Sequence, residues 1–255
     1  MVTNIILVGC FGRMGRVMRG VIGRDPSAEI VAGVDTAHRG DGIPFPLFND
    51  INHCDMPADV IVDFSGVGAI YSLLNFSTKK NIPLVICTTG YAADVYDDIR
   101  FAAQNAAIFQ SHNMSLGVNL LVNTLKRVSK LLYDAQFDIE IIERHHYTKI
   151  DAPSGTALTL AESVNNALGG HMRIVNDRSN NRAKRERDEI GVHSLRGGTI
   201  VGDHSVVFAG LDEVIEFNHS IYSRDVFAVG ALKAAQFMKG KPPGFYTMQD
   251  LLDSL

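Results

Sequence analysis

The sequence predicts an α/β protein: a Rossmann-like, parallel-sheet dinucleotide-binding domain with an inserted α+β domain built on an open mixed sheet. Two observations lead to this fold class. In the first half of the chain, short apolar runs alternate with helical patterns, as a parallel sheet with crossover helices requires. The second half has one long helical pattern followed by several runs of β-forming residues. We expect a dinucleotide-binding domain over residues 1–115, an inserted substrate-binding and oligomerisation domain over residues 116–223, and a return to the first domain over residues 224–255.

Five short apolar runs in the first half are predicted to be strands of the parallel sheet. They are Asn4–Val8, Ile30–Val34, Val60–Phe64, Leu84–Cys87 and Ala107–Phe109. Two amphipathic helices are predicted between these strands. Apolar residues recur at helical spacing in the first helix (Met14, Val17, Met18, Val21 and Ile22) and in the second (Ile70, Leu73 and Leu74).

The second half begins with a long helix predicted over Leu116–Tyr133, with its apolar side formed by Leu120, Leu121, Leu125, Val128, Leu131 and Leu132. Phe137–Ile142 alternates apolar and acidic residues, which is typical of a half-exposed strand. Gly191–Tyr222 indicates further strands, and Val226–Met238 indicates a helix. Arg178–Glu189 carries charges of both signs, and we predict a solvated loop there.

The composition excludes several classes of protein. With 46% hydrophobic and 20% charged residues, the 255-residue chain is not mainly disordered. Its net charge of −4 argues against a nucleic-acid partner. No apolar stretch approaches the roughly 18–20 residues that a membrane span needs, and the three widely spaced cysteines fit a reducing compartment. We therefore expect a cytoplasmic protein with neither a membrane nor a nucleic-acid partner.

The sharpest motif of the first half is the glycine-rich turn Gly9–Gly15, which follows a predicted strand and opens a predicted helix. Glycines in such a turn relieve backbone strain and let a pyrophosphate approach the free N–H groups of the helix. Arg13 adds a positive charge there. The alternative is a turn that needs glycine only for its shape.

Asp35 favours nucleotide binding over a turn that is merely rich in glycine. It ends the second predicted strand, 20 residues after Gly15. A carboxylate at that place accepts hydrogen bonds from the ribose hydroxyls. Asp35 favours a free 2′-hydroxyl, whereas His38 and Arg39 could meet a 2′-phosphate. Both NADH and NADPH therefore remain candidate cofactors.

Two further turns, Asp63–Gly66 and Cys87–Gly90, follow predicted strands at their carboxyl ends. Ligands gather at this edge of an open α/β sheet. Each turn alone is also explained as an ordinary loop. Because the two share this edge, we expect them, with Thr88 and Thr89, to lie where the nicotinamide binds.

The segment His145–Thr156 contains a predicted anion site. Pro153 cannot lie inside a helix, whereas Ser154 is a good N-cap, so Gly155 and Thr156 form the first turn of a helix. Such a turn presents backbone N–H groups and the positive end of the helix dipole to an anion. A Ser-Gly-Thr start is also common capping chemistry, but in this context it favours a substrate carboxylate.

Three titratable residues precede that turn. Lys149 could place an ammonium against the same anion, and His145 and His146 titrate near neutrality and could move a proton. Adjacent residues of an extended chain point to opposite faces, so at most one of the two histidines faces a given ligand. Adjacent histidines also lack the spacing of zinc ligands, and we predict no metal. With a nicotinamide cofactor, this set predicts a reductase of a small dicarboxylate.

Six parts of the chain match motifs of one known family: Gly9–Gly15, Cys87–Gly90, Asn113–Asn119, His145–Thr156, Arg196–His204 and His219–Arg224. In these motifs the sequence resembles the 4-hydroxy-tetrahydrodipicolinate reductases, or dihydrodipicolinate reductases, and the resemblance runs from Asn4 to about Leu252. It implies that hydride passes from NAD(P)H to C4 of a cyclic dicarboxylic imine with loss of water, a step of lysine and diaminopimelate synthesis. It also implies a homotetramer built through the sheet of the inserted domain.

The resemblance further implies roles for single residues. His145 would donate a proton, and Lys149 would assist protonation and substrate binding. The substrate would be held by His146, Ser154, Gly155, Thr156 and Thr89. The cofactor would be lined by Gly12, Arg13, Met14, Asp35, Phe64, Gly68, Cys87 and Thr89. The chain departs from the common family pattern at Ser65, Cys87, Tyr147 and Thr148. Because Cys87 stands where a glycine is more common, its contact with the nicotinamide would be through its backbone. Because Tyr147 and Thr148 stand where many relatives carry basic residues, fewer positive charges would surround the substrate.

Two other functions stay open on the sequence alone. One is a reductase of the same architecture that acts on another small acid, although the Pro-Ser-Gly-Thr turn favours a carboxylate-rich substrate. The other is a non-catalytic nucleotide sensor, which would have no need of Lys149 beside two histidines.

Overall fold

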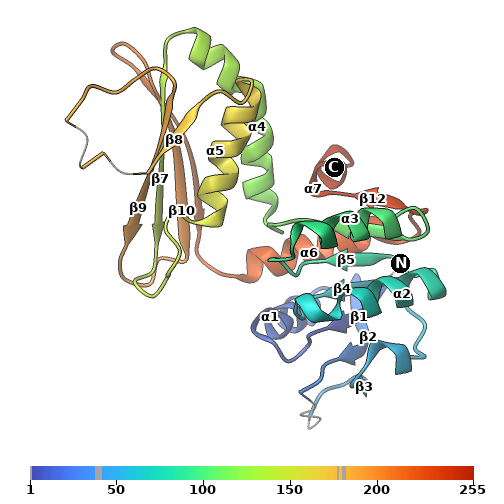
Figure 1. The fold of residues 1–255 in the computed structure, drawn as a ribbon. Coiled ribbons are helices and arrows are strands. Elements are labelled where there is room, and N and C mark those ends of the chain that lie inside the picture. The colour runs from blue at the N-terminus through green and yellow to red at the C-terminus, as the bar shows by residue number, and fades with distance from the viewer. Residues whose placement is uncertain (1, 38–41, 177, 180–181) are drawn as a thin grey trace. The chain divides into compact units, whose positions relative to one another are not determined.

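The computed structural model describes residues 2–37, 42–176, 178–179 and 182–255. The chain forms two compact units. The first contains the chain up to Leu116 together with Arg224–Leu255, and the second contains Gly117–Ser223 (Figure 1). Within the described residues, no helix is both long enough and apolar enough to cross a membrane.

The first unit is built on a seven-stranded sheet in which every described strand pair is parallel. The spatial order is β3-β2-β1-β4-β5-β6-β12, so the order reverses between β1 and β4. Ligands bind at such a reversal in doubly wound folds. The strands are β1 (Thr3–Val8), β2 (Ala28–Val34), β3 (Leu47–Phe48), β4 (Val60–Asp63), β5 (Leu84–Ile86), β6 (Ala107–Gln110) and β12 (Gly244–Tyr246).

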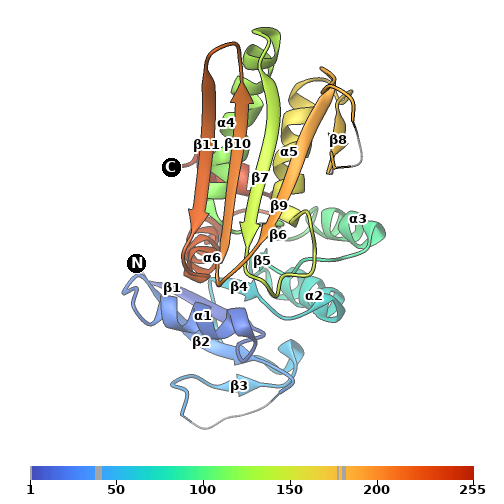
Figure 2. The same ribbon diagram turned by 90° about the vertical axis from the view of Figure 1, so that its left-hand side faces the viewer.

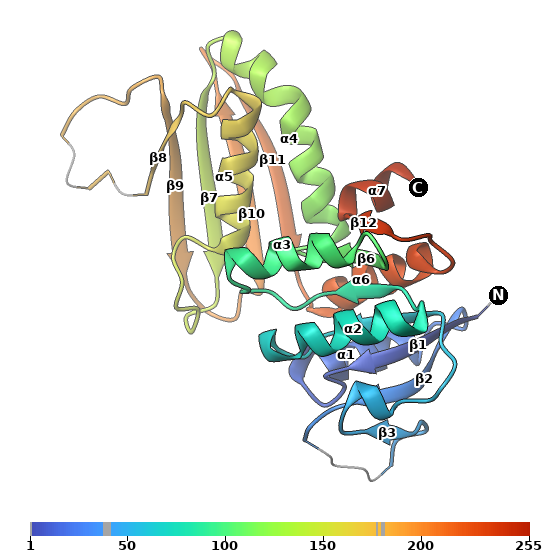
Figure 3. The same cartoon turned by 45° about the vertical axis from the view of Figure 1, so that its right-hand side comes forward.

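Helices cover both faces of this sheet (Figure 3), because alternate residues of its buried strands pack into two separate hydrophobic cores. One core contains α1 (Arg13–Ile22), α6 (Asp225–Met238) and α7 (Met248–Asp253). The other contains α2 (Ile70–Lys80), α3 (Ala93–Ala102) and the 3-10 turn η1 (Ile51–His53). A second 3-10 turn, η2 (Val67–Ala69), leads into α2. The predicted Rossmann-like architecture is confirmed.

The second unit has the predicted open mixed sheet, in the order β11-β10-β7-β9-β8 (Figure 2). Its central strand β7 (Asp138–His145) runs antiparallel to β10 (Gly202–Ala209) and parallel to β9 (Glu189–Arg196). The outer strands are β11 (Val214–Ile221) and β8 (Arg173–Val175). Residues of β7 alternate between buried and half-buried, so one face of the sheet meets a helical layer and the other does not.

The helical layer of this unit consists of α4 (Leu116–Asp134) and α5 (Gly155–Ala167) (Figure 1). The predicted apolar side of α4 was partly wrong. Leu125 is fully buried, but Leu120 and Leu131 are 59% and 69% exposed. The buried residues of α4 are Val118, Leu125 and Ser129, so its packed face is centred near Leu125, and Leu120 and Leu131 lie roughly 120–140° around the helix from that residue.

Several elements were not predicted because local pattern does not mark them. β3, β8 and β12 have only two or three residues each, and they are defined by pairing with a neighbouring strand. α3 buries a single helical residue, Ile99, and so lacks a clear apolar stripe.

The charged segment Arg178–Glu189 is not a simple solvated loop in its described part. Arg185 is only 18% exposed and donates hydrogen bonds to Asp138 and Glu140 on β7. Those acidic residues are half-buried members of the alternating pattern in β7, so this strand provides the partners that hold the charged segment.

Candidate functional site

The glycine turn of the first unit joins β1 to α1 under tight steric limits. Gly9 has a φ of +75°, and a Cβ there would lie 2.6 Å from the carbonyl oxygen of Phe64. A Cβ on Gly15 would lie 2.1 Å from the carbonyl oxygen of Gly9. Gly12 is the N-cap of α1, which has neither a side-chain cap nor an acidic residue in its first turn. The helix therefore begins with N–H groups that no side chain satisfies, as a pyrophosphate site requires.

Asp35 holds this turn in place. One carboxylate oxygen accepts a hydrogen bond from the amide of Phe11 at 2.9 Å, and the other accepts from the amide of Ala37 at 2.9 Å. Each oxygen keeps a further lone pair for a ribose hydroxyl. Asp35 thus has a structural task besides the predicted one. His38 and Arg39 lie outside the described residues.

A cavity of about 730 Å³ opens beside the turn. Of the predicted cofactor residues, Gly9, Gly12, Asp35 and Phe64 line it. The segments that enclose it follow β1, β2 and β4, at the point where the strand order reverses. The volume lies within the range of small-molecule and cofactor sites. The residues present therefore fit a dinucleotide.

The other predicted cofactor residues do not line that cavity. Gly15 is buried under the turn, and Met14 packs against the apolar core. Arg13 and Gly68 are exposed, and a Cβ on Gly68 would meet nothing within 4 Å. Among the residues that the structure describes, the cation in the cavity lining is Arg16, which was not predicted. Arg16 lies one helical turn beyond Gly12, and this spacing is the signal that could have identified it.

The turn after β5 contains Cys87, Thr88 and Thr89, with Cys87 partly buried and Thr89 exposed. Beside it, the carboxyl group of Asp63 is fully buried and accepts hydrogen bonds from the amide and hydroxyl of Ser65. Burial raises the pKa of Asp63. Its second oxygen and the hydroxyls of Thr88 and Tyr91 are buried atoms without a hydrogen-bond partner in the described structure.

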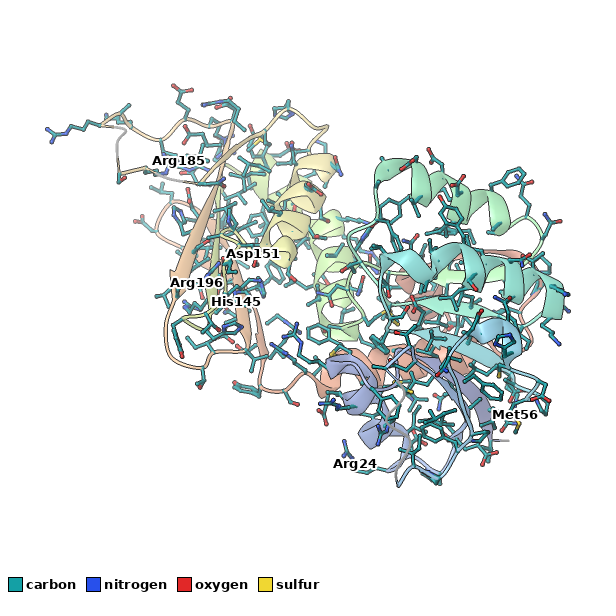
Figure 4. All side chains as sticks on the ribbon, turned by 60° about the horizontal axis from the view of Figure 1, so that its bottom comes forward. Arg24, Met56, His145, Asp151, Arg185 and Arg196 are labelled. Atoms are coloured by element: carbon teal, nitrogen blue, oxygen red, sulfur yellow. The ribbon has the colours of Figure 1, made fainter. Side chains whose placement is uncertain are left out.

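In the second unit, the predicted site is organised by a residue that was not predicted, Glu143. Its side chain is fully buried at the end of β7. The carboxylate accepts a hydrogen bond from Nδ1 of His145 at 2.6 Å and from the amide of Ser154 at 3.1 Å. It also accepts two bonds from Arg196 on β9, at 2.7 and 2.8 Å. Figure 4 shows His145, Arg196 and Asp151 gathered at one end of this sheet.

Ser154 is the N-cap of α5, as predicted. Its hydroxyl accepts from the amide of Ala157 at 3.1 Å and lies 3.0 Å from Nε2 of His204. With 2% of its surface exposed, Ser154 is occupied by these partners. The more accessible part of the helix start is formed by Gly155 and Thr156, where an anion would meet the N–H groups of the first turn.

Lys149 and His146 lie in the turn between β7 and α5. The side chain of Lys149 is 20% exposed, and its ammonium pairs with the carboxylate of Asp151 at 2.8 Å. Nδ1 of His146 lies 2.7 Å from the hydroxyl of Thr148. The carbonyl of Asp151 accepts a bond from Arg196 at 2.6 Å, so the same arginine holds both Glu143 and this turn.

Protonation in this cluster follows from burial and charge. Burial raises the pKa of Glu143, but hydrogen bonds from Arg196, Ser194 and His145 outweigh it and lower the pKa to about 2. Burial lowers the pKa of His145, opposed by Glu143 and aided by Lys149 and Arg196. The carboxylate is therefore ionised, and Nδ1 of His145 is the donor in the bond between them.

Acid is expected to weaken the second unit in two stages. Burial lowers the pKa of His204 from 6.5 to about 4, and that of Glu143 falls from 4.5 to about 2. Both folded values lie below the unfolded ones, so each contribution is fully present above the unfolded pKa, 6.5 for His204 and 4.5 for Glu143, and is lost as pH falls from that value through the folded one. The free energy of unfolding should drop by roughly 2–3 kcal/mol from His204 alone between pH 7.5 and 4.5.

Urea unfolding at several pH values measures this drop. His204→Gln is the comparison variant, because glutamine does not titrate. The first stage should be absent in that variant, and an equal pH dependence in the two proteins would contradict the assignment to His204.

No group of three or more His, Cys, Asp or Glu side chains suited to a metal ion is found among the residues that the structure describes. From the sequence, Arg196 and His204 were identified only as parts of matching motifs, and no role was predicted for Glu143. Glu143 and His145 have an i, i+2 spacing on a strand, which places both side chains on one face. That spacing was the available signal for this pair.

Comparison with known proteins adds independent findings. The family model described as dihydrodipicolinate reductase, N-terminus, matches residues 3–114, and the model for the C-terminus of the same enzyme matches residues 117–252. A protein of Clostridium novyi (strain NT) named 4-hydroxy-tetrahydrodipicolinate reductase is 45% identical over 252 residues, which are 99% of this chain and 99% of that protein. A protein of the same name from Clostridium tetani (strain Massachusetts / E88) is 46% identical over 254 residues, covering 100% of this chain and 98% of that protein.

Solved structures with the same fold include a dipicolinate-bound dihydrodipicolinate reductase from Paenisporosarcina sp. TG-14. It aligns with a TM-score of 0.80 at 22% identity and covers 97% of this chain and 98% of its own. A probable dehydrogenase from Thermotoga maritima aligns with a TM-score of 0.61 at 12% identity, covering 97% of this chain and 92% of its own. At these identities, the likeness concerns the fold alone.

Proposed function

The chain belongs to the dihydrodipicolinate reductase family and is an oxidoreductase, and from this membership we propose that it reduces 4-hydroxy-tetrahydrodipicolinate to tetrahydrodipicolinate with NAD(P)H. The reaction belongs to the diaminopimelate route to lysine. The observation that carries the proposal is the cluster of His145, Lys149 and the start of α5 in a chain whose other unit has a dinucleotide-type cavity. The family resemblance inferred from the sequence is confirmed by both family models.

The net reaction takes up one hydride and one proton and releases one water. Bound NAD(P)H supplies the hydride. His145 is the proposed proton donor, because Nδ1 is bound to Glu143 and Nε2 forms no hydrogen bond within the described part of the chain. An anionic substrate favours the protonated imidazole that this role needs. Lys149 would leave Asp151 for a substrate carboxylate and support the same proton transfer.

Substrate recognition is proposed to rest on positive groups arranged around a dianion. The N–H groups at Gly155 and Thr156 would bind one carboxylate through the helix dipole and direct hydrogen bonds. Lys149, His146 and Ser154 complete the predicted set in the second unit, with Ser154 supporting the turn from its buried position. Thr89 is the proposed substrate contact from the first unit.

For the cofactor, we propose that both NADH and NADPH are used. Gly9 and Gly12 would let the pyrophosphate approach the start of α1, and Asp35 would accept from the ribose. Arg16 lines the cavity and supplies a positive charge that suits either the pyrophosphate or a 2′-phosphate. The remaining proposed cofactor contacts are Arg13, Met14, Gly15, Phe64, Gly68, Cys87, Thr88 and Thr89.

We also propose a cytoplasmic homotetramer, assembled through the sheet of the second unit. The face of this sheet opposite α4 and α5 carries exposed apolar residues, including Leu195 at 48% and Val214 at 57% exposure. Exposed apolar residues on an open sheet face suit association with another copy. Sedimentation of the purified protein measures the number of subunits.

The deciding experiment is NADPH and NADH oxidation in the presence of freshly generated 4-hydroxy-tetrahydrodipicolinate. We expect steady turnover with this substrate and none with unrelated small acids. Steady consumption of reduced cofactor would exclude the non-catalytic sensor. Folded protein that binds NADPH but does not turn over this substrate would refute the proposed function.

A further inference from the structure

From the geometry of the second unit, we infer that Glu143 is the positioning residue of the proposed active site. It fixes the ring of His145 through Nδ1, so that Nε2 is the nitrogen available for proton transfer, and it ties that ring to the start of α5. This inference rests on the proposed function, because it assigns a task within that reaction. Glu143 itself does not touch the proposed reacting atoms.

The first argument is burial. Glu143 has no exposed surface, and a carboxylate there is costly unless its oxygens are paired and hydrogen-bonded. One oxygen accepts from His145 and Arg196, and the other accepts from Ser154 and Arg196. The bidentate arginine satisfies the charge and fixes the plane of the carboxylate. The bonds from His145 and Ser154 then hold a histidine ring and a helix terminus in one geometry.

The second argument concerns the other side of the ring. A Cβ on Gly202 would lie only 3.0 Å from Nε2 of His145, so any side chain at this position would crowd that nitrogen. Gly202 begins β10, and its lack of a side chain leaves space at Nε2. Within the described residues, the ring is thus held at Nδ1 and has no hydrogen-bond partner at Nε2, the arrangement that a proton donor oriented by a carboxylate requires.

The third argument concerns charge. The ionisable groups around His145 are Glu143, Arg196, Lys149 and His204, with Asp151 paired to Lys149. Glu143 is the anion in direct contact, and the cations oppose protonation of the ring. Loss of the Glu143 charge should therefore lower the pKa of His145. The fall of kcat with rising pH, which follows the loss of the His145 proton and is called the pH limb below, should then move to lower pH.

The test compares Glu143→Gln with Glu140→Gln. Glu140 is a matched control, because it lies on the same strand and also pairs with an arginine and a histidine, Arg185 and His193, on the opposite face. We expect Glu143→Gln to lower kcat about 100-fold, the loss typical of a misplaced catalytic group, with the KM for NADPH unchanged. The fall of kcat with rising pH should begin at lower pH than in the wild type. Glu143→Asp, which keeps the charge, should keep the wild-type limb at an intermediate rate.

Glu140→Gln should keep both the wild-type rate and the wild-type pH limb, with gel filtration checking that all variants share one oligomeric state. A Glu143→Gln protein with a near-normal rate, or with a reduced rate and an unmoved pH limb, overturns the inference. An equal loss in Glu140→Gln overturns it as well.

A measurement on the wild type keeps the inference testable if the variants fold poorly. Nitrogen NMR of the unliganded protein should show neutral His145 protonated at Nδ1, with a strongly deshielded Nδ1 proton. The Nε2-protonated tautomer would overturn the inference. This readout needs no turnover, so absent activity in the wild type would count against the proposed function and not against the placement of the ring.

Discussion

Replacing Lys149 by alanine is expected to lower kcat/KM for 4-hydroxy-tetrahydrodipicolinate by about 100- to 10,000-fold, the range found when a proton-transfer group is removed. The side chain of Lys149 is 20% exposed, and its ammonium pairs with the carboxylate of Asp151. Its removal would leave a substrate carboxylate without its ammonium partner. It would also remove the proposed assistance to proton transfer from His145. Because Lys149 belongs to the second unit, binding of NADPH in the cavity of the first unit should not change.

Steady-state kinetics and NADPH fluorescence titration measure the two effects separately. Lys130→Ala is the matched control, since Lys130 is an exposed lysine of the same unit that also pairs with one aspartate at 2.8 Å. It should behave like the wild type. Near-normal turnover of Lys149→Ala, or an equal loss in the control, would refute the role of Lys149.

Gly15→Ala is expected to destabilise the first unit by about 3 kcal/mol and to weaken NADPH binding by at least about tenfold. The added Cβ would lie 2.1 Å from the carbonyl oxygen of Gly9, a backbone atom that cannot rotate away. Either α1 or the glycine turn must move, and both form the cavity wall. Thermal unfolding should shift downward by roughly 6–12 °C for a unit of this size.

Gly20→Ala in the same helix is the control for this prediction. Its Cβ would meet only the end of the Arg24 side chain, at 3.5 Å. Alanine in a helix is favoured over glycine by about 0.5–1 kcal/mol, so the control should be slightly more stable and should bind NADPH normally. The steric argument would be wrong if the two variants had the same melting temperature and cofactor affinity.

Much of the first unit could be predicted because its signals are local. The apolar runs of β1, β2, β4, β5 and β6 and the stripe of α1 can be recognised within windows of a few residues. The glycine turn is equally local, since a Cβ on Gly9 or Gly15 would clash with backbone atoms of the β1–α1 connection or of the turn after β4. Arg16 was not predicted, because it follows the last glycine of the motif and its place in the cavity lining depends on how the first turn of α1 is oriented.

In the second unit, only part of the site could be predicted from local sequence signals. The start of α5 was predicted from Pro153 and Ser154, since capping is a local property. Glu143 directly follows the predicted alternating strand Phe137–Ile142, and no role was predicted for it. Its role depends on Arg196, 53 residues away, and on Ser154, 11 residues away, which the sheet and the β7–α5 turn bring to one carboxylate. The same holds for His204, which meets Ser154 across 50 residues.

The sequence by itself determined the fold class, the phosphate-type turn, the titratable residues His145, His146 and Lys149, and the helix start that follows them. Each depends on residue type and on spacings of a few residues along the chain. Only the tertiary structure decided which nitrogen of His145 is held, which residue holds it, and which cation lines the cavity. Burial and hydrogen bonding between strands distant in sequence decide these points, because a carboxylate becomes a fixed, ionised support only when a folded interior surrounds it with donors.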